Sequence, residues 1–204
     1  EGEVIFAEVC RRAAERASLI GLQGLCVRGE LPTPEILRVD CVDALPWPRF
    51  DGLPINTYWC PDAVASPMVT VMTARGCPHH CAYCSSPTLF GSKIRARSPA
   101  AVVAELARLR DQFGIEQISF VDDVFSLPRP RTLALCRAMA SRNLGLRWFC
   151  NARADQIDSE LADAMAKAGC HQVYLGFESG SQPVLDAVQK GVTVEELERG
   201  AAVG

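Results

Sequence analysis

The sequence has no excess of positive charge and no long hydrophobic run, and each absence excludes a class of protein. Its 204 residues carry 21 Lys and Arg against 24 Asp and Glu, a formal net charge of −3. A dedicated nucleic-acid-binding module carries a broad basic field, so nucleic acid is not the expected partner. No apolar run reaches the roughly 18 uncharged residues that cross a bilayer. We therefore expect no membrane span.

Signal-peptide features are also missing from the first residues. Glu1, Glu3 and Glu8 place acidic charge where a signal peptide carries basic charge. We therefore predict a cytoplasmic protein. Hydrophobic residues make up 49% of the chain and charged residues 22%, a balance that is typical of a globular protein with a sizeable core.

Cysteine is abundant, and its distribution separates three residues from the other seven. A cytoplasmic compartment keeps thiols reduced, so clustered cysteines there bind metal more often than they form disulfides. Three of the ten cysteines are crowded into one loop, namely Cys77, Cys81 and Cys84. The others stand singly among apolar residues and are predicted to be small buried hydrophobes; these are Cys10, Cys26, Cys41, Cys60, Cys136, Cys150 and Cys170.

Residues 1–66 differ from the rest of the chain in their many prolines. A helix is predicted over 4–19 and a short strand over 24–28. Prolines then follow at short intervals, at Pro32, Pro34, Pro46, Pro48, Pro54, Pro61 and, just beyond, Pro67. Because proline breaks helices and central strands, we predict a linker or the trailing edge of another domain.

From residue 68 onward, short apolar segments alternate with amphipathic helices. Strands are predicted over 68–73, 117–121, 147–150 and 172–177. Helices are predicted over 99–113, 131–142, 159–168 and 182–190, and a fifth begins near Thr193 with a capping box to Glu196. The alternation indicates α/β architecture with a parallel sheet. A closed eight-stranded barrel takes roughly 250 residues, so we expect four βα units of a chain that is cut at both ends.

The loop after the first predicted strand can hold a metal. Residues 77–84 read CPHHCAYC, a C-x3-C-x2-C spacing. Three thiolates this close can hold three irons of a four-iron cluster, which leaves the fourth iron open for an outside ligand. The same spacing permits a zinc site that His79 or His80 completes. The spacing favours iron–sulfur and leaves zinc open.

This spacing, with an aromatic residue just before the last cysteine, resembles the radical S-adenosylmethionine (radical SAM) superfamily. The resemblance implies a 4Fe–4S cluster on Cys77, Cys81 and Cys84, with S-adenosylmethionine on the open iron and Tyr83 at its adenine. In that family, reductive cleavage of the cofactor gives a 5'-deoxyadenosyl radical, which abstracts hydrogen from the substrate. For this chain we expect a small-molecule substrate. The resemblance further implies an external electron donor such as flavodoxin or ferredoxin, and a partial TIM-type (β/α)6 barrel whose first four units are present.

Other motifs of the family stand where the predicted strands end, and parallel βα folds collect their active sites there. The resemblance implies that Asp122 or Asp123 accepts a hydrogen bond from the cofactor's amino group. It implies that Glu178 binds the ribose hydroxyls, with Ser179 beside it allowing close approach of the backbone. Arg153 is suited to hold the cofactor carboxylate through its planar fork.

Each of these positions also has a purely structural interpretation. An aspartate at a strand end commonly caps a turn. Arg153 can form a surface ion pair with Asp155. The segment around Glu178 can serve only as the entry to a helix that Ser181 caps.

Two features resemble the cobalamin-linked branch of the family. Glu1-Gly2-Glu3 followed by Phe6 resembles the signature that closes a cobalamin-binding domain, and LPWPRF at 45–50 resembles the connector into the radical domain. We therefore expect 1–66 to be the C-terminal edge of a cobalamin-binding domain plus a linker, and 67–204 to be the radical SAM core. None of the three histidines stands in an Asp-x-His-x-x-Gly pattern, so cobalamin would be bound mainly upstream of this chain.

The predicted reaction is methyl transfer from methylcobalamin to an unactivated carbon, or a radical cyclisation. The tRNA methylthiotransferases share the cluster motif, but they usually have Gln where Glu178 stands, which argues against them. A non-catalytic zinc-binding module is the alternative from another class. The residues that select the substrate are expected outside these 204 residues.

Overall fold

The computed structural model describes residues 1–31 and 37–203, which form two compact units, Glu1–Leu45 and Pro46–Gly204. In the first unit, helix α1 (Glu3–Ala14) is followed by turns and by a short 3-10 helix, η1 (Val42–Ala44). The helix predicted over 4–19 therefore ends five residues early. The strand predicted over 24–28 is wrong, because positive φ angles at Gly21, Gly24 and Gly29 turn the chain repeatedly.

Three cysteines of the first unit correct a prediction. Cys10, Cys26 and Cys41 are exposed, not buried. Among the described residues of this unit only Val42 is buried, so there is no core to cover them. Pro32 and Pro34 of the predicted proline-rich segment lie outside the described residues. The assignment of 1–66 to the edge of a cobalamin-binding domain stays a prediction.

Residues 46–66, predicted as linker, belong to the second unit by their contacts. Ile55, in the short helix η2 (Ile55–Thr57), lies in the main hydrophobic core. The backbone N–H groups of Val64 and Ala65 both donate to Oε1 of Gln117, each at 2.8 Å. These contacts attach the segment to the beginning of a sheet strand.

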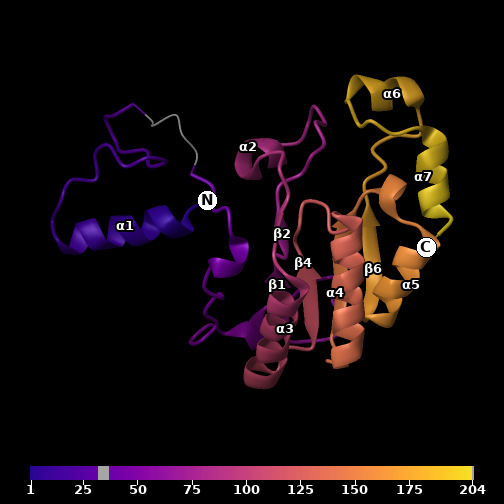
Figure 1. Ribbon diagram of the computed structural model, residues 1–204, viewed down its shortest axis with the longest axis horizontal. Helices are drawn as coiled ribbons and strands as arrows, with labels where there is room; N and C mark the ends of the chain where they lie inside the picture. Colours follow the sequence, from indigo (N-terminus) through magenta and orange to yellow (C-terminus); the bar gives the residue numbers. More distant parts are fainter. Residues whose placement is uncertain (32–36, 204) are drawn as a thin grey trace. The chain divides into compact units, whose positions relative to one another are not determined.

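The second unit is built on a four-stranded parallel sheet, in the order β1-β4-β5-β6 (Figure 1). The strands are β1 (Met68–Val71), β4 (Gln117–Phe120), β5 (Arg147–Ala152) and β6 (Cys170–Leu175). Their crossover helices are α3 (Pro99–Phe113), α4 (Arg129–Arg142) and α5 (Ser159–Lys167). Successive strands are neighbours, so all four strand ends lie along one edge. The predicted α/β fold with four βα units is confirmed.

Local signals explain where the crossover helices begin and end. Ser98 caps α3 by accepting from the N–H of Ala101 at 3.2 Å, and Gly114, with φ +65°, ends it in the left-handed conformation. The bounds of α3 agree with the prediction. Asp158, not foreseen as a cap, begins α5 by accepting from the N–H of Leu161 at 2.8 Å.

The main core lies between the sheet and these helices. Trp148, Phe120 and Phe125 are almost fully buried there, with ring centroids 4.9 to 5.2 Å apart. Two further predicted cysteines, Cys136 and Cys150, are buried in this layer as expected, whereas Cys60 and Cys170 are only half-buried. No helix among the described residues is long and apolar enough to span a membrane.

Two helices follow β6 and enclose a second, smaller core of Ala154, Leu185, Val192 and Leu197. Helix α6 (Gln182–Ala187) ends before the predicted stop at Gly191, because Gln189 already has a positive φ of 53°. Ser181 precedes it without a capping hydrogen bond from its side chain. Helix α7 (Val194–Ala201) has the predicted capping box between Thr193 and Glu196.

Candidate functional site

The loop that carries the three clustered cysteines is closed at its base by a short hairpin. Strand β2 (Ala74–Arg75) pairs antiparallel with β3 (Arg95–Ala96), and the backbone N–H of Cys77 donates to the carbonyl of Gly91 at 3.2 Å. Gly76 has φ +94°, and a Cβ there would overlap the carbonyl oxygen of Lys93. Only glycine therefore lets the loop leave β2 at this angle.

A cavity of about 300 Å³ brings this loop together with the carboxyl ends of β4, β5 and β6. Seven of the nine residues predicted from the sequence line it, namely Cys77, Cys81, Tyr83, Cys84, Asp123, Arg153 and Glu178. Asp122 and Ser179 do not. The cavity lies where βα folds place their active sites, because the strand-end loops converge there.

The three thiols of the loop all line the cavity. Within the described ranges, no group of three His, Cys, Asp or Glu side chains meets closely enough to hold one metal ion. A zinc site needs its ligands around one point, whereas each cysteine of a 4Fe–4S cluster binds a different iron. Burial raises the pKa of Cys77, because it disfavours the charged thiolate. Bound metal offsets this effect by stabilising the thiolate.

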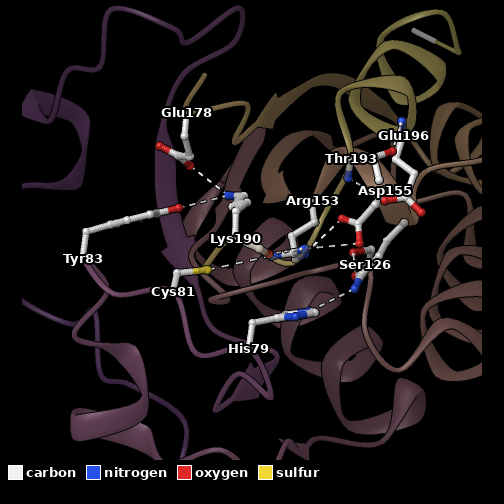
Figure 2. Close-up of polar contacts among 11 residues, drawn as sticks. His79, Cys81, Tyr83, Ser126, Arg153, Asp155, Glu178, Lys190, Thr193 and Glu196 are labelled. Carbon is white, nitrogen blue, oxygen red and sulfur yellow. Dashed lines mark hydrogen bonds and ion pairs between the residues drawn. The ribbon is translucent and has the colours of Figure 1, made fainter. Parts of the chain in front are cut away.

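The two histidines of the loop have different surroundings. His80 is exposed, whereas Nε2 of His79 lies 3.1 Å from Nε2 of Gln156 (Figure 2). The Gln156 amide nitrogen can only donate, so this His79 nitrogen accepts. Ser126 donates to Oε1 of Gln156 at 2.9 Å and fixes the amide. Burial lowers the pKa of His79, and Arg153 lowers it further. Sequence reasoning missed Gln156 because no motif marks it.

The adjacent aspartates at the end of β4 point in different directions. Asp122 is 2% exposed, and its carboxylate accepts from both the N–H and the hydroxyl of Thr73. Arg131 in turn donates to that hydroxyl oxygen at 2.8 Å. Asp123 lines the cavity and accepts from the N–H of Gly76 at 3.1 Å. Of the two alternatives, the structure places Asp123 beside the cysteines and Asp122 inside the protein.

Arg153, at the end of β5, is buried beside the cysteine loop. Its Nε lies 3.0 Å from Oδ1 of Asp155, and its Nη1 lies 3.9 Å from Sγ of Cys81. The ion pair with Asp155 therefore exists, but the Arg153 side chain is only 6% exposed and lines the cavity. A guanidinium in this position can bind a carboxylate strongly, because little water competes for it.

Glu178 follows β6 in a left-handed conformation, with φ +61°. Its Oε1 lies 2.8 Å from Nζ of Lys190, which lowers the pKa of Glu178. Lys190 also donates to the hydroxyl of Tyr83 at 3.1 Å (Figure 2). Sequence reasoning missed Lys190, whose only mark is an isolated charge before Gly191. Ser179 does not line the cavity, and its hydroxyl oxygen accepts from the N–H of Ser181.

Comparisons with known proteins agree with this geometry. The profile described as "Radical SAM superfamily" matches residues 71–202. An uncharacterized methyltransferase of Pyrococcus horikoshii is 36% identical over 202 residues, which cover 96% of this chain and 43% of that protein. An anaerobic magnesium-protoporphyrin IX monomethyl ester cyclase of Rubrivivax gelatinosus is 32% identical over 76% of this chain and 26% of its own length.

Solved structures are similar as well. The radical S-adenosylmethionine methyltransferase TsrM from Kitasatospora setae, solved with cobalamin and a 4Fe–4S cluster, superposes with a TM-score of 0.61 at 27% identity. The match covers 67% of this chain and 28% of that protein. The chain thus spans less than half the length of these relatives. Since the profile covers well over half of its residues, the chain belongs to the radical SAM superfamily.

Proposed function

We propose that this chain is the cluster- and cofactor-binding part of a cobalamin-dependent radical SAM enzyme that transfers a methyl group to an unactivated carbon or closes a ring. The observation that carries the proposal is the cavity in which the cysteines meet Asp123, Arg153 and Glu178. Membership in the superfamily implies a 4Fe–4S cluster and S-adenosylmethionine as its cofactors. The chemical groups of that cofactor match the charges around the cavity.

Three polar groups of S-adenosylmethionine have a complementary side chain at the cavity. The carboxylate of Asp123 would accept from the cofactor's amino group, and the guanidinium of Arg153 would bind its carboxylate. Glu178 would accept from the ribose hydroxyls, and Tyr83 would border the adenine. When bound, the cluster and S-adenosylmethionine supply a carbon-centred radical by one-electron reduction. The residues of this chain bind and orient the cofactor for that step.

The relatives support the branch and the reaction class. They are named for methyl transfer and for ring closure, and TsrM was solved with cobalamin. They give no support to tRNA methylthiolation. We propose a small-molecule substrate, an external electron donor such as flavodoxin or ferredoxin, and a cytoplasmic location. Cobalamin would be bound mainly by residues upstream of this chain. Residues 1–66 would be the C-terminal edge of that domain plus a linker, of which 46–66 pack as part of the second unit.

Removing single thiols tests the cluster assignment. After anaerobic reconstitution, the wild type should contain about four irons and four sulfides per chain, as a four-iron cluster does. Cys77→Ala, Cys81→Ala and Cys84→Ala should each lose most of this iron and sulfide. Cys41→Ala, at an exposed thiol outside the cavity, is the matched control and should keep both. A full complement in the Cys77→Ala variant would contradict the proposal.

A further inference from the structure

Lys190 contacts three residues that the sequence assigns to the cofactor, although no motif assigns a role to Lys190 itself. Its Nζ lies 2.8 Å from Oε1 of Glu178 and 3.1 Å from the hydroxyl of Tyr83. Its backbone carbonyl accepts from Nη2 of Arg153 at 3.0 Å. Figure 2 shows Lys190 between these side chains. One residue thus links the cysteine loop, the end of β5 and the segment after β6.

The backbone around Lys190 is shaped to point this side chain inward. Gln189 and Gly191 on either side both have positive φ angles, 53° and 67°. A non-glycine residue in this conformation is held there by its surroundings. Just before them, the carbonyl of Val188 accepts from the N–H of Ala82 at 2.9 Å. The segment 188–191 is therefore bonded to the cysteine loop through backbone and side chain.

The pair of Lys190 and Glu178 lies directly against Gly176. A Cβ at Gly176 would lie 2.9 Å from both Oε1 of Glu178 and Nζ of Lys190, so the ends of these side chains would have to shift. The missing side chain leaves the room that the ion pair occupies. Lys190, at 6% exposure, is buried, and a buried ammonium is stable only when it is paired.

The charge of Lys190 prepares Glu178 to accept hydrogen bonds. A carboxylate has two oxygens and about four lone-pair sites, and Lys190 uses one oxygen. The hydrogen bond from Lys190 lowers the pKa of Glu178, and Tyr83 contributes to the same shift. The lone pairs that remain on the carboxylate can accept from hydroxyl groups. Without Lys190, the strained backbone at Glu178 and its side chain would lose the bond that orients them.

We propose that Lys190 is a positioning residue for the ribose of S-adenosylmethionine. It aims the Glu178 carboxylate at the ribose hydroxyls, and it fixes Tyr83 of the cysteine loop beside the same carboxylate. The inference rests on the proposed function, because it takes Glu178 as the ribose-binding residue. Lys190 acts through Glu178 and needs no contact with the cofactor.

The test measures how much binding weakens when one ribose hydroxyl is removed from the ligand, which we call hydroxyl discrimination. Binding is measured by calorimetry on the cluster-loaded protein. The ligands are S-adenosylmethionine and its analogues that lack the 2'- or the 3'-hydroxyl. In the wild type, removing the hydroxyl that Glu178 binds should weaken binding about tenfold or more, the factor for a hydrogen bond to a charged acceptor. In Lys190→Met, the same removal should cost less than about threefold.

Four further variants make the result specific to the charge. Lys190→Arg keeps the cation and should restore most of the discrimination. Glu178→Gln should lose it, and combining Glu178→Gln with Lys190→Met should add nothing more, as expected of residues that act as a unit. Lys167→Met, at an exposed lysine at the end of α5, is the matched control and should behave as the wild type. If Lys190→Met does not retain its cluster, Lys190→Gln takes its place under the same criterion.

The outcomes separate this inference from the function on which it rests. A wild type that does not bind S-adenosylmethionine would overturn the proposed function. A wild type that binds it and discriminates, with Lys190→Met discriminating equally, would overturn the role of Lys190 and leave the function standing. Binding without any hydroxyl preference in the wild type would overturn the role of Glu178, and with it that of Lys190.

Discussion

At the scale of single residues, Asp122 and Asp123 show how neighbours in sequence acquire different roles. Both aspartates follow β4, which ends at Phe120. Asp122 accepts from Thr73 inside the protein, and Asp123 lines the cavity. The sequence identified the pair but left open which of them faces the cofactor. That choice depends on how the residues after β4 pack against Thr73, which no local motif contains.

Alanine substitutions should separate these two roles. Asp122→Ala leaves the N–H and hydroxyl of Thr73 without their buried acceptor, and should lower the free energy of unfolding by about 2–4 kcal/mol. Asp123→Ala should cost no more than about 1 kcal/mol and should weaken binding of S-adenosylmethionine instead. Urea unfolding of the cluster-free protein and calorimetry of the loaded protein measure the two effects. The reverse pattern would assign the structural role to Asp123.

At the scale of the element, the helices show which boundaries a sequence predicts well. Ser98 and Thr193 stand directly before α3 and α7, and each accepts from an N–H only three residues further on. Both caps can therefore be predicted from the sequence alone. The early end of α6 is different, because the chain turns at Gln189 and Lys190 contacts Glu178 and Tyr83. The end of this helix therefore depends on tertiary contacts. The same contacts explain why Lys190 was absent from the predicted site.

Asp158 gives helix α5 a pH-dependent stability. Its hydrogen bond from the N–H of Leu161 lowers its pKa, and Arg129 at 2.7 Å adds to this. Asp158→Ala should cost about 1 kcal/mol at neutral pH, as for other helix caps. A lowered folded-state pKa contributes stability that is complete above the unfolded value of about 4 and is lost as the pH falls through the folded value. The gap in stability between the cluster-free wild type and the variant should therefore narrow as the pH falls below about 4, and a gap that does not narrow would contradict this explanation.

Helix α7 packs closely against the short helix η3 (Ala154–Gln156), which follows Arg153. A Cβ at Gly200 would overlap the carbonyl of Ala154, so Gly200→Ala should lower the free energy of unfolding by about 1–3 kcal/mol. Gly180→Ala is the matched control, because a Cβ there has no neighbour within 4 Å. Thermal unfolding should show a lower midpoint for Gly200→Ala alone, and equal midpoints for the two variants would refute the packing argument.

At the scale of the whole molecule, the order β1-β4-β5-β6 explains why distant residues share one cavity. Parallel strands joined by helices end at the same edge, so Cys77 and Glu178 meet although a hundred residues separate them. The βα alternation predicted this fold, and the strand-end rule predicted most of the cavity. The contributions of Lys190 and Gln156 arise from loop packing, which alternation and strand ends do not encode. The same limit applies to residues 46–66, which look like linker but pack as part of the second unit.

The central claim is that three cysteines hold a four-iron cluster with one iron open to S-adenosylmethionine. Electron paramagnetic resonance tests it most directly, on anaerobically reconstituted, dithionite-reduced protein before and after addition of S-adenosylmethionine. We predict the signal of a reduced four-iron cluster, and a change in that signal when the cofactor binds the open iron. A cluster signal that S-adenosylmethionine leaves unchanged, or protein that takes up zinc and shows no cluster signal, would contradict the claim.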